Sequence, residues 1–327
     1  MIIARVPFRI SFFGGGTDFP SWFNHNLGHV ISTTINKYCY VTCRVLPPFF
    51  DHKYRITYSK IEHTQSLKDI QLAPVREALR FLKETRGMEI RYDADLPART
   101  GLGSSSSFIV GLLHTLKTLH QQPSTKKSLA NDAIFLEREI LKECVGSQDQ
   151  TNAAYGGLNY IKFQKDDNNI ISPIAISSSR KKELNNHLLL FFTGISRLSS
   201  TISQDQQKNL KKNETTLTKM SDLVNQAKDI LEKEKDITQF GELLHYTWKL
   251  KKSLSSKISS SQIDNLYSCA QQHGAIGGKL LGAGAGGFFL VFAKPEDHQN
   301  IIKALSPRIH IPFQFENQGS HIIFQYS

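Results

Sequence analysis

The sequence predicts an α+β protein made of two domains. The chain has 327 residues, which is enough for two domains of ordinary size. Residues 30–45 are rich in β-branched and aromatic side chains, as in a strand, whereas apolar side chains recur at helical spacing from residue 104 onward. A polar segment at residues 164–186 marks the expected boundary, and we place the domains at 1–178 and 179–327.

In the first domain we expect strands followed by helices. The predicted strands cover residues 30–45, 54–59, 88–96 and 158–163, and the predicted helices cover 73–86, a stretch starting at Ser104, and 126–143. Prolines at 47, 48 and 97 and glycines at 87, 156 and 157 mark the breaks between them. On the helix after Ser104, one face carries Ile109, Leu112, Leu113 and Leu116.

The second domain is also expected to mix both kinds of element. Predicted helices cover roughly 200–234, 237–254, 260–273 and 295–305, and predicted strands cover 187–193, 275–281 and 287–293, with one or two more toward the C-terminus. The sequence contains no internal repeat, so a solenoid or propeller is not expected.

Composition excludes several classes of protein. Hydrophobic residues make up 39% of the chain, which supports a sizeable core and excludes dominant disorder. No apolar run approaches the roughly 18 residues that span a bilayer, and no secretory signal is recognised. The four cysteines, at positions 39, 43, 144 and 269, lack CxxC spacing. We therefore expect a cytoplasmic protein without a membrane partner.

The charge balance points to anionic ligands. Lysine and arginine number 40 against 29 acidic residues, a formal charge of +11. No known nucleic-acid-binding motif occurs, so we expect no nucleic-acid partner. Much of the charge lies between Lys208 and Lys257, where we interpret it as the solvated faces of helices.

A glycine- and serine-rich segment, residues 97–107, follows a predicted strand and opens a predicted helix. Such a helix N-terminus favours anions, and the two glycines let the backbone approach a phosphate. The candidate nucleotide-binding residues are Pro97, Gly101, Leu102, Gly103, Ser104, Ser105 and Ser106. The segment is not a Walker A loop, and a serine-rich helix cap after a flexible loop is the alternative interpretation.

Two carboxylates follow this segment. Glu137 shares a helix face with Ala133, Ile140 and Leu141, so its burial calls for a cation, either Mg²⁺ beside nucleotide phosphates or a buried arginine. Asp149, in the loop GSQDQ, has the chemistry to accept a proton from a substrate hydroxyl, and a helix cap is its alternative role.

Two further glycine-rich segments complete the pattern. The first is Gly14-Gly15-Gly16-Thr17-Asp18, in which Asp18 is a candidate ligand for sugar hydroxyls. The second, residues 277–287, contains the run GAGAGG between two predicted strands, which indicates close backbone packing against a loop or a ligand.

The three segments in this order, GGGTD, PxxxGLGSSSS and GAGAGG, resemble the motifs of the GHMP small-molecule kinases across essentially the whole chain. Within that family, GGGTD, GSQDQ, AAYGG, TGISR and GKLLGAGAGGF are most similar to the heptose 7-phosphate kinases. The resemblance implies an N-terminal domain like the second domain of ribosomal protein S5, a C-terminal ferredoxin-like domain, and an active site between them.

The resemblance also implies residue roles. Ser105 and Glu137 would bind Mg²⁺, Asp149 would act as the base, and Arg9 would stand beside the transferred phosphoryl group. The residues expected at the acceptor are Gly15, Gly16, Thr17, Asp18, Arg197 and Gly284. Arg197 and Lys252 are candidate ligands for a phosphate on the acceptor, and solvated helix residues are the alternative interpretation. Galactokinases have Glu-His where this chain has Gly15-Gly16, which argues for a different, phosphorylated sugar.

The sequence therefore predicts an ATP- and Mg²⁺-dependent kinase that phosphorylates the anomeric hydroxyl of a phosphoheptose. Its partner would be a small phosphosugar, and a homodimer is left open. Alternatives are a galactose- or fucose-type kinase, a decarboxylase of the mevalonate-diphosphate type, and a non-catalytic sugar or nucleotide sensor. The sensor interpretation is disfavoured, because Ser105, Glu137 and Asp149 are all present.

Overall fold

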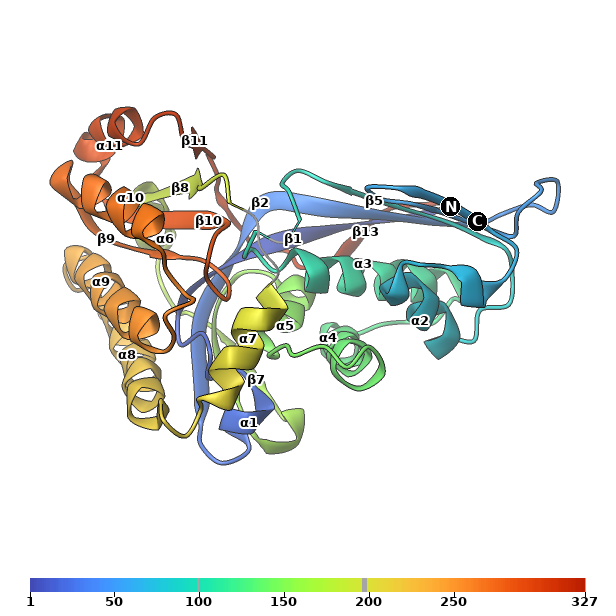
Figure 1. Ribbon diagram of the computed structural model, residues 1–327, viewed down its shortest axis with the longest axis horizontal. Coiled ribbons are helices and arrows are strands. Elements are labelled where there is room, and N and C mark those ends of the chain that lie inside the picture. Colours follow the sequence, from blue (N-terminus) through green and yellow to red (C-terminus); the bar gives the residue numbers. More distant parts are fainter. Residues whose placement is uncertain (99, 196–198, 327) are drawn as a thin grey trace.

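Two β-sheets, one large and one small, organise the fold (Figure 1). The computed structural model describes residues 1–98, 100–195 and 199–326. Within these ranges the large sheet has nine strands and the small sheet has four. Helices accompany both sheets and nearly all strand pairs are antiparallel, so the predicted α+β class is confirmed.

The large sheet is built around its two longest strands, β1 and β2, which pair antiparallel along most of their length. The other edge of β2 is shared in turn by β6, β12 and β5, while β13 pairs with the free side of β1. Its strands are β1 (Ile2–Phe13), β2 (Gly28–Val45), β3 (Tyr54–Thr57), β4 (Ile61–Thr64), β5 (Met88–Ala94), β6 (Leu158–Phe163), β7 (Ile170–Pro173), β12 (Phe315–Glu316) and β13 (His321–Gln325).

Helices of the first half lie on one face of this sheet (Figure 1). They are α1 (Pro20–Phe23), α2 (Ala73–Phe81), α3 (Ser104–Leu119), α4 (Lys126–Phe135) and α5 (Gln148–Tyr155). The longest, α3, packs against β1 and β2. Its predicted apolar face is confirmed, because the side chains of Ile109, Leu112, Leu113 and Leu116 are fully buried.

The small sheet has the order β11-β8-β10-β9 and forms the centre of the second half. Its strands are β8 (Leu188–Phe192), β9 (Ala275–Leu280), β10 (Phe288–Ala293) and β11 (Ile309–His310). The accompanying helices are α6 (Ser178–Asn186), α7 (Ser199–Lys208), α8 (Glu214–Glu232), α9 (Thr238–Ser253), α10 (Ser261–Gln272) and α11 (His298–Ala304). None of the helices in the described ranges has the length and apolar character needed to cross a bilayer.

Some predicted elements differ from the structure in extent. The helix expected over 73–86 ends at Phe81, and the stretch 200–234 is divided into α7 and α8. The helix expected over 126–143 is regular only to Phe135 and continues as a π-helical turn, Leu136–Ile140. The boundary at residue 178 remains a prediction. The last strands, β12 and β13, return to the large sheet.

The two sheets meet through a shared aromatic core. The ring of Phe240, on α9, contacts Phe12 and Phe13 of β1 in edge-to-face geometry, with centroids 5.5 and 5.0 Å away. The same ring lies 6.0 Å from Phe292 of the small sheet. Because one aromatic residue touches both sheets, the ends of β1 and β9 are brought together, and the candidate site lies at this junction.

Candidate active site

The serine-rich segment predicted to bind phosphate forms the start of α3. Gly101 and Gly103 adopt φ values of 85° and 77°, which favour glycine. Gly103 precedes the first helical residue, Ser104. Between the glycines, Leu102 is buried, and its carbonyl accepts a hydrogen bond from the backbone N–H of Arg9 (3.1 Å). The loop is thus held against β1, with a helix N-terminus that favours anions.

The glycine-rich loop between β9 and β10 packs directly on the predicted phosphate-binding segment at residues 97–104, the phosphate loop. A Cβ atom on Gly282 would lie 2.5 Å from the Gly101 Cα, and one on Gly287 would lie 2.2 Å from the Thr100 carbonyl oxygen. The Phe288 N–H also donates to the Thr100 carbonyl (3.0 Å). These contacts leave no room for side chains at Gly282 and Gly287. The glycine-rich loop therefore packs closely against the phosphate loop and supports it.

Two predicted ligand residues lie beside these contacts. Pro97 is exposed, and its carbonyl accepts a hydrogen bond from the Thr100 hydroxyl (2.7 Å). Gly284 has a φ of 127°, and a Cβ there would come within 2.9 Å of the Ile258 backbone. Gly284 therefore packs closely against the backbone of Ile258, and its contact with a substrate remains a prediction.

Arg9 and Asp149, the predicted catalytic residues, contact each other directly. Arg9 lies on β1 and is 4% exposed, whereas Asp149, on the first turn of α5, is 27% exposed at its side chain. The guanidinium donates from Nε to Oδ1 and from Nη2 to Oδ2 of the carboxylate, each at 2.8 Å. Its Nη1 donates to the Gly101 carbonyl (2.6 Å). The pair therefore lies against the phosphate loop.

The turn after β1 is closed by Thr17. This residue is fully buried, and its hydroxyl donates to the Gly14 carbonyl (2.8 Å) and accepts from the His29 N–H (3.1 Å). The Thr17 hydroxyl is therefore engaged within the turn. The role of Thr17 at the acceptor remains a prediction.

Asp18 lies at the end of the same turn and faces α5. It is 2% exposed, and its carboxylate accepts from the Gly16 N–H (3.0 Å) and, more weakly, from the Gln148 N–H (3.4 Å). Burial, together with the nearby charge of Asp149, raises the pKa of Asp18. The structure thus places the two predicted aspartates, Asp18 and Asp149, close enough for the charge of one to affect the pKa of the other.

Glu137 lies on the π-helical turn and is fully buried. The Ser106 hydroxyl donates to its Oε2 (2.8 Å), and the side-chain amide of Gln150 contacts the same oxygen. Burial raises the pKa of Glu137 to about 8. Both partners are neutral, and the adjacent Arg138 pairs with Asp167 instead (2.8 Å). π-Helical turns are frequent at functional sites.

The oxygen atoms around Glu137 fit a Mg²⁺ ion that arrives with a nucleotide. Mg²⁺ prefers one or two carboxylates, with its remaining ligands taken from phosphate and water. Gln150 Oε1 is buried and has no hydrogen-bond partner within the described ranges, so polar capacity remains beside the carboxyl group. Ser105, the predicted ligand, is exposed on the first turn of α3, whereas Ser106 points at Glu137.

The structure describes only one of the two candidate phosphate-binding cations on the acceptor side. Arg197 lies outside the ranges that the structure describes. Lys252 forms an ion pair with Asp264 (2.9 Å), and its ammonium lies over the Trp248 ring. The residues that would hold an acceptor phosphate therefore remain a prediction.

Lys279, on β9, is a buried lysine that the sequence analysis did not single out. It is 2% exposed, and its ammonium donates to the carbonyl oxygens of Ser11 (2.9 Å) and Phe12 (2.8 Å) on β1. Burial lowers its pKa well below the usual value. The side chain ties the small sheet to the strand that carries Arg9.

A second buried lysine, Lys251 on α9, lies close by. Its ammonium donates to the Leu280 carbonyl (3.2 Å) and contacts that of Gly282 in the glycine-rich loop. Burial, reinforced by the charge of Arg9, lowers its pKa to about 7, and the charge of Asp18 opposes this shift. Lys251 therefore interacts electrostatically with two predicted site residues, Arg9 and Asp18.

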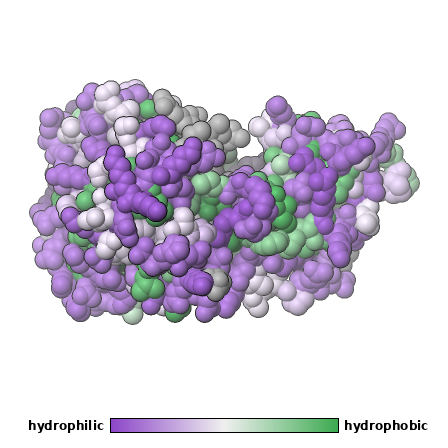
Figure 2. All heavy atoms as spheres, turned by 60° about the horizontal axis from the view of Figure 1, so that its bottom comes forward, coloured by the Kyte–Doolittle hydropathy of each residue, from purple (hydrophilic) through white to green (hydrophobic). Residues whose placement is uncertain are grey.

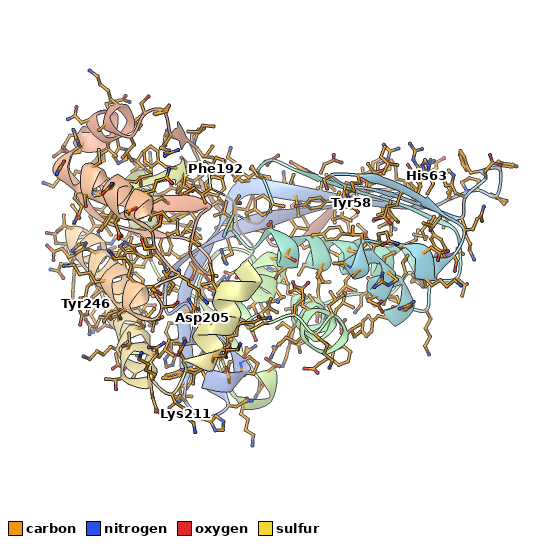
Figure 3. The ribbon with its side chains drawn as sticks, viewed as in Figure 1. Tyr58, His63, Phe192, Asp205, Lys211 and Tyr246 are labelled. Atoms are coloured by element: carbon orange, nitrogen blue, oxygen red, sulfur yellow. The ribbon has the colours of Figure 1, made fainter. Side chains whose placement is uncertain are left out.

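Helix α7 lies near the middle of the molecule, where Figure 3 labels Asp205 on it. Asp205 accepts hydrogen bonds from the Ser255 hydroxyl (2.6 Å) and the Lys257 ammonium (3.0 Å). A small cavity of about 10 Å³ is lined by Gly16 of the GGGTD turn and, near the end of α7, by Gln206 and Gln207. In the face shown in Figure 2, hydrophilic residues cover most of the surface and hydrophobic ones gather toward the centre. Helix α7 thus borders the GGGTD turn.

Comparison with protein families gives two matches. Residues 73–157 match the model of the GHMP kinases N terminal domain, and residues 226–308 match that of the GHMP kinases C terminal domain. Together the two matches cover just over half of the chain.

Individual proteins resemble the chain over nearly its full length. The D-glycero-alpha-D-manno-heptose 7-phosphate kinase of Campylobacter jejuni is 29% identical in an alignment of 320 positions that covers 93% of each chain. A structure of a D-glycero-D-manno-heptose 1-phosphate kinase from Bacteroides thetaiotaomicron covers 100% of both chains at 23% identity, with a TM-score of 0.82. A putative sugar kinase from Campylobacter jejuni, 25% identical, covers 98% of this chain and 97% of its own, with a TM-score of 0.74.

Proposed function

Because the chain belongs to the GHMP kinases, we propose that it is an ATP-dependent sugar kinase that phosphorylates the anomeric C1 hydroxyl of D-glycero-D-manno-heptose 7-phosphate. The product is the 1,7-bisphosphate, which serves the synthesis of nucleotide-activated heptose for cell-surface polysaccharide. Sugar phosphorylation follows from the family and the named relatives. The heptose and the C1 position are the finer part of the proposal.

One observation carries the proposal of phosphoryl transfer. The Arg9–Asp149 pair lies directly against the phosphate loop, since a Cβ on Gly103 would stand 3.3 Å from both the Arg9 Cγ and an Asp149 carboxylate oxygen. Phosphoryl transfer depends on positioning and charge stabilisation more than on covalent catalysis. A base, a cation and an anion-binding helix N-terminus meet here at one point.

In the proposed reaction the acceptor hydroxyl oxygen attacks the γ-phosphorus of ATP. A new P–O bond forms to the sugar while the bond to the ADP oxygen breaks, and the hydroxyl proton passes to the Asp149 carboxylate and then to water. Arg9 holds the carboxylate in place and stabilises the charge that develops between acceptor and phosphoryl group. The first turn of α3 binds the phosphates through its N–H groups.

A metal ion has a place in this scheme beside Glu137. Mg²⁺ would be held by the Glu137 carboxylate with the hydroxyls of Ser105 and Ser106, and it would neutralise charge on the nucleotide phosphates. With its pKa raised to about 8, Glu137 holds a proton near neutral pH, and this proton would have to leave before the carboxylate could hold the cation.

Two observations support the heptose as acceptor. The heptose 7-phosphate kinase relative aligns over 93% of both chains. In addition, Gly15 and Gly16 provide no side chain at the positions that Glu and His occupy in galactokinases, which leaves space for a longer acceptor. Both favour a phosphorylated heptose over an unmodified hexose.

A substrate panel tests the proposal. ADP release is measured with ATP, Mg²⁺ and each of four acceptors: D-glycero-D-manno-heptose 7-phosphate, the same heptose without phosphate, D-galactose and L-fucose. We expect the 7-phosphate to give the highest kcat/KM, and phosphorus NMR of the product to show a second phosphate coupled to the anomeric proton. Phosphorylation at a primary hydroxyl, or equal rates with an unphosphorylated hexose, would overturn the heptose assignment.

A further inference from the structure

The middle glycine of the GGGTD turn is not required by the backbone. Gly14 has a φ of 80°, and a Cβ there would lie 1.8 Å from the His29 carbonyl oxygen, while Gly16 has a φ of 104°. The φ of Gly15 lies outside the left-handed region that favours glycine. The atoms nearest to its Cβ position are the Ser11 hydroxyl oxygen at 3.8 Å and the Gln148 amide nitrogen at 3.9 Å. These are ordinary contact distances, so the fold would accept a side chain here.

Ser11 faces this space with an unsatisfied hydroxyl group. Its side chain is 5% exposed, and its Oγ has no hydrogen-bond partner within the described part of the chain. Its cross-strand neighbour on β2, Ser32, is already engaged, because the Ser32 hydroxyl donates to Asn152 (2.7 Å). A buried polar group without a partner costs stability, so its retention calls for an explanation.

Gln148 contributes its side-chain amide to the same space from α5, and the amide nitrogen is the atom that lies near the Gly15 Cβ position. Its Oε1 is also buried and has no partner among the described residues. Gln148 directly precedes Asp149, and Ser11 lies two positions after Arg9, on the same side of β1. The two unsatisfied side chains therefore flank the Arg9–Asp149 pair on the side of the GGGTD turn.

We propose that Ser11 and Gln148 form a specificity-determining subsite, opened by Gly15, that binds an alcohol hydroxyl of the acceptor next to the one phosphorylated. An alcohol both donates and accepts, so it can donate to Gln148 Oε1 and accept from the Ser11 hydroxyl. An ionised phosphate oxygen only accepts and would leave the glutamine oxygen unsatisfied. The inference rests on the proposed sugar kinase activity and adds two residues to its acceptor site.

Three variants test the subsite. Ser11→Ala removes the hydroxyl, Gly15→Ala fills the space, and Ser124→Ala is the matched control, because the Ser124 hydroxyl, before α4, also lacks a partner within the described ranges. For each variant we measure kcat, the KM of ATP, the KM of D-glycero-D-manno-heptose 7-phosphate and the Tm without ligands.

We expect Ser11→Ala to raise the KM of the acceptor about 3- to 10-fold, the size of one neutral hydrogen bond, with the KM of ATP unchanged and the Tm equal or higher. Gly15→Ala should raise the KM of the acceptor more than 10-fold without lowering the Tm, because alanine fits this backbone conformation. Ser124→Ala should change neither KM.

An unchanged acceptor KM in both site variants would overturn the inference, as would a lowered Tm in Ser11→Ala with no change in KM. A wrong assignment of the sugar is distinguished from a wrong subsite, because the substrate panel on the wild-type protein identifies the preferred sugar before any variant is compared. If another sugar is preferred, its KM replaces that of the heptose. Calorimetric titration with the heptose 7-phosphate gives the same comparison without turnover, and equal affinity of wild type and Ser11→Ala would also overturn the subsite.

Discussion

Arg9 binds both carboxylate oxygens of Asp149 through two parallel hydrogen bonds of 2.8 Å. This bidentate geometry fixes the plane of the carboxylate on α5 relative to β1, two elements that are far apart in the sequence. Because the third guanidinium nitrogen donates to Gly101, the same side chain also fixes the phosphate loop (2.6 Å). One arginine therefore fixes the position of the proposed base relative to the predicted phosphate-binding loop.

Replacing Asp149 by Asn should remove proton acceptance with little change in shape. General-base contributions are typically about 10²- to 10⁴-fold, so we expect kcat to fall by roughly that factor while ATP still binds. Steady-state kinetics and ATP titration measure the two effects. Asp132→Asn, which alters an ion pair with Lys117 on the helices, is the control and should keep its kcat. Full activity of Asp149→Asn would show that the proton leaves by another route.

The two neighbouring serines should separate metal binding from folding. Ser105 is exposed, so Ser105→Ala should leave the Tm unchanged and weaken Mg²⁺-dependent turnover. Ser106 donates to Glu137, so Ser106→Ala should also cost about 1 kcal/mol of stability. Thermal unfolding and a Mg²⁺ titration of the rate test both statements. Equal turnover in Ser105→Ala at low Mg²⁺ would contradict its role as a ligand.

Glu137 should make the ligand-free protein less stable as the pH rises. The folded state holds a proton on this group up to about pH 8, whereas the ordinary pKa of a glutamate in an unfolded chain is 4.5. Stability therefore falls as the pH rises between these values, by up to about 1.4 kcal/mol per pH unit.

The Glu137→Gln variant lacks this titration. Its free energy of unfolding should depend less on pH and exceed that of the wild type near pH 8, and its response to Mg²⁺ should be lost. Urea unfolding at several pH values checks the slope. Parallel profiles for the two proteins, with the response to Mg²⁺ retained, would instead assign a structural role to the carboxyl group.

Contact between the two glycine-rich loops should control nucleotide affinity. Gly282→Ala would place a methyl group 2.5 Å from the Gly101 Cα at a φ of 69°, so the loop must move. We expect a loss of more than about 1 kcal/mol of stability and a higher KM for ATP. Gly157→Ala is the control, since its φ is 87° but its nearest atom is 3.7 Å away. The same rise in KM for ATP in both variants would mean that loop contact is not the cause.

Sequence patterns predicted the elements but not the local geometry of the site. Periodicity predicted α3, and the apolar neighbours of Glu137 predicted its burial, which is complete. The π-helical turn that aims this carboxyl at Ser106 was not predicted, because one extra residue per turn leaves no distinct pattern in composition.

The buried lysines were missed for different reasons. Lys251 lies in the run KLKK on α9, where the sequence predicted a solvated helix face, and only the packing of the small sheet shows that it is enclosed. Lys279 stands alone in the apolar strand AIGGKL, which is a visible signal of a buried cation with carbonyl partners. Ser11 and Gln148 meet only through the fold, so no spacing rule could have joined them.

The tie between Lys279 and the carbonyls of β1 has a consequence for how the molecule unfolds. Separating the two sheets would break both hydrogen bonds of the Lys279 side chain to β1 and would expose the apolar surface that Phe240 buries against Phe12 and Phe13. Neither half is then a self-sufficient foldon. Calorimetry should record a single cooperative transition for the whole chain, and the two halves expressed as separate fragments should refold only when mixed.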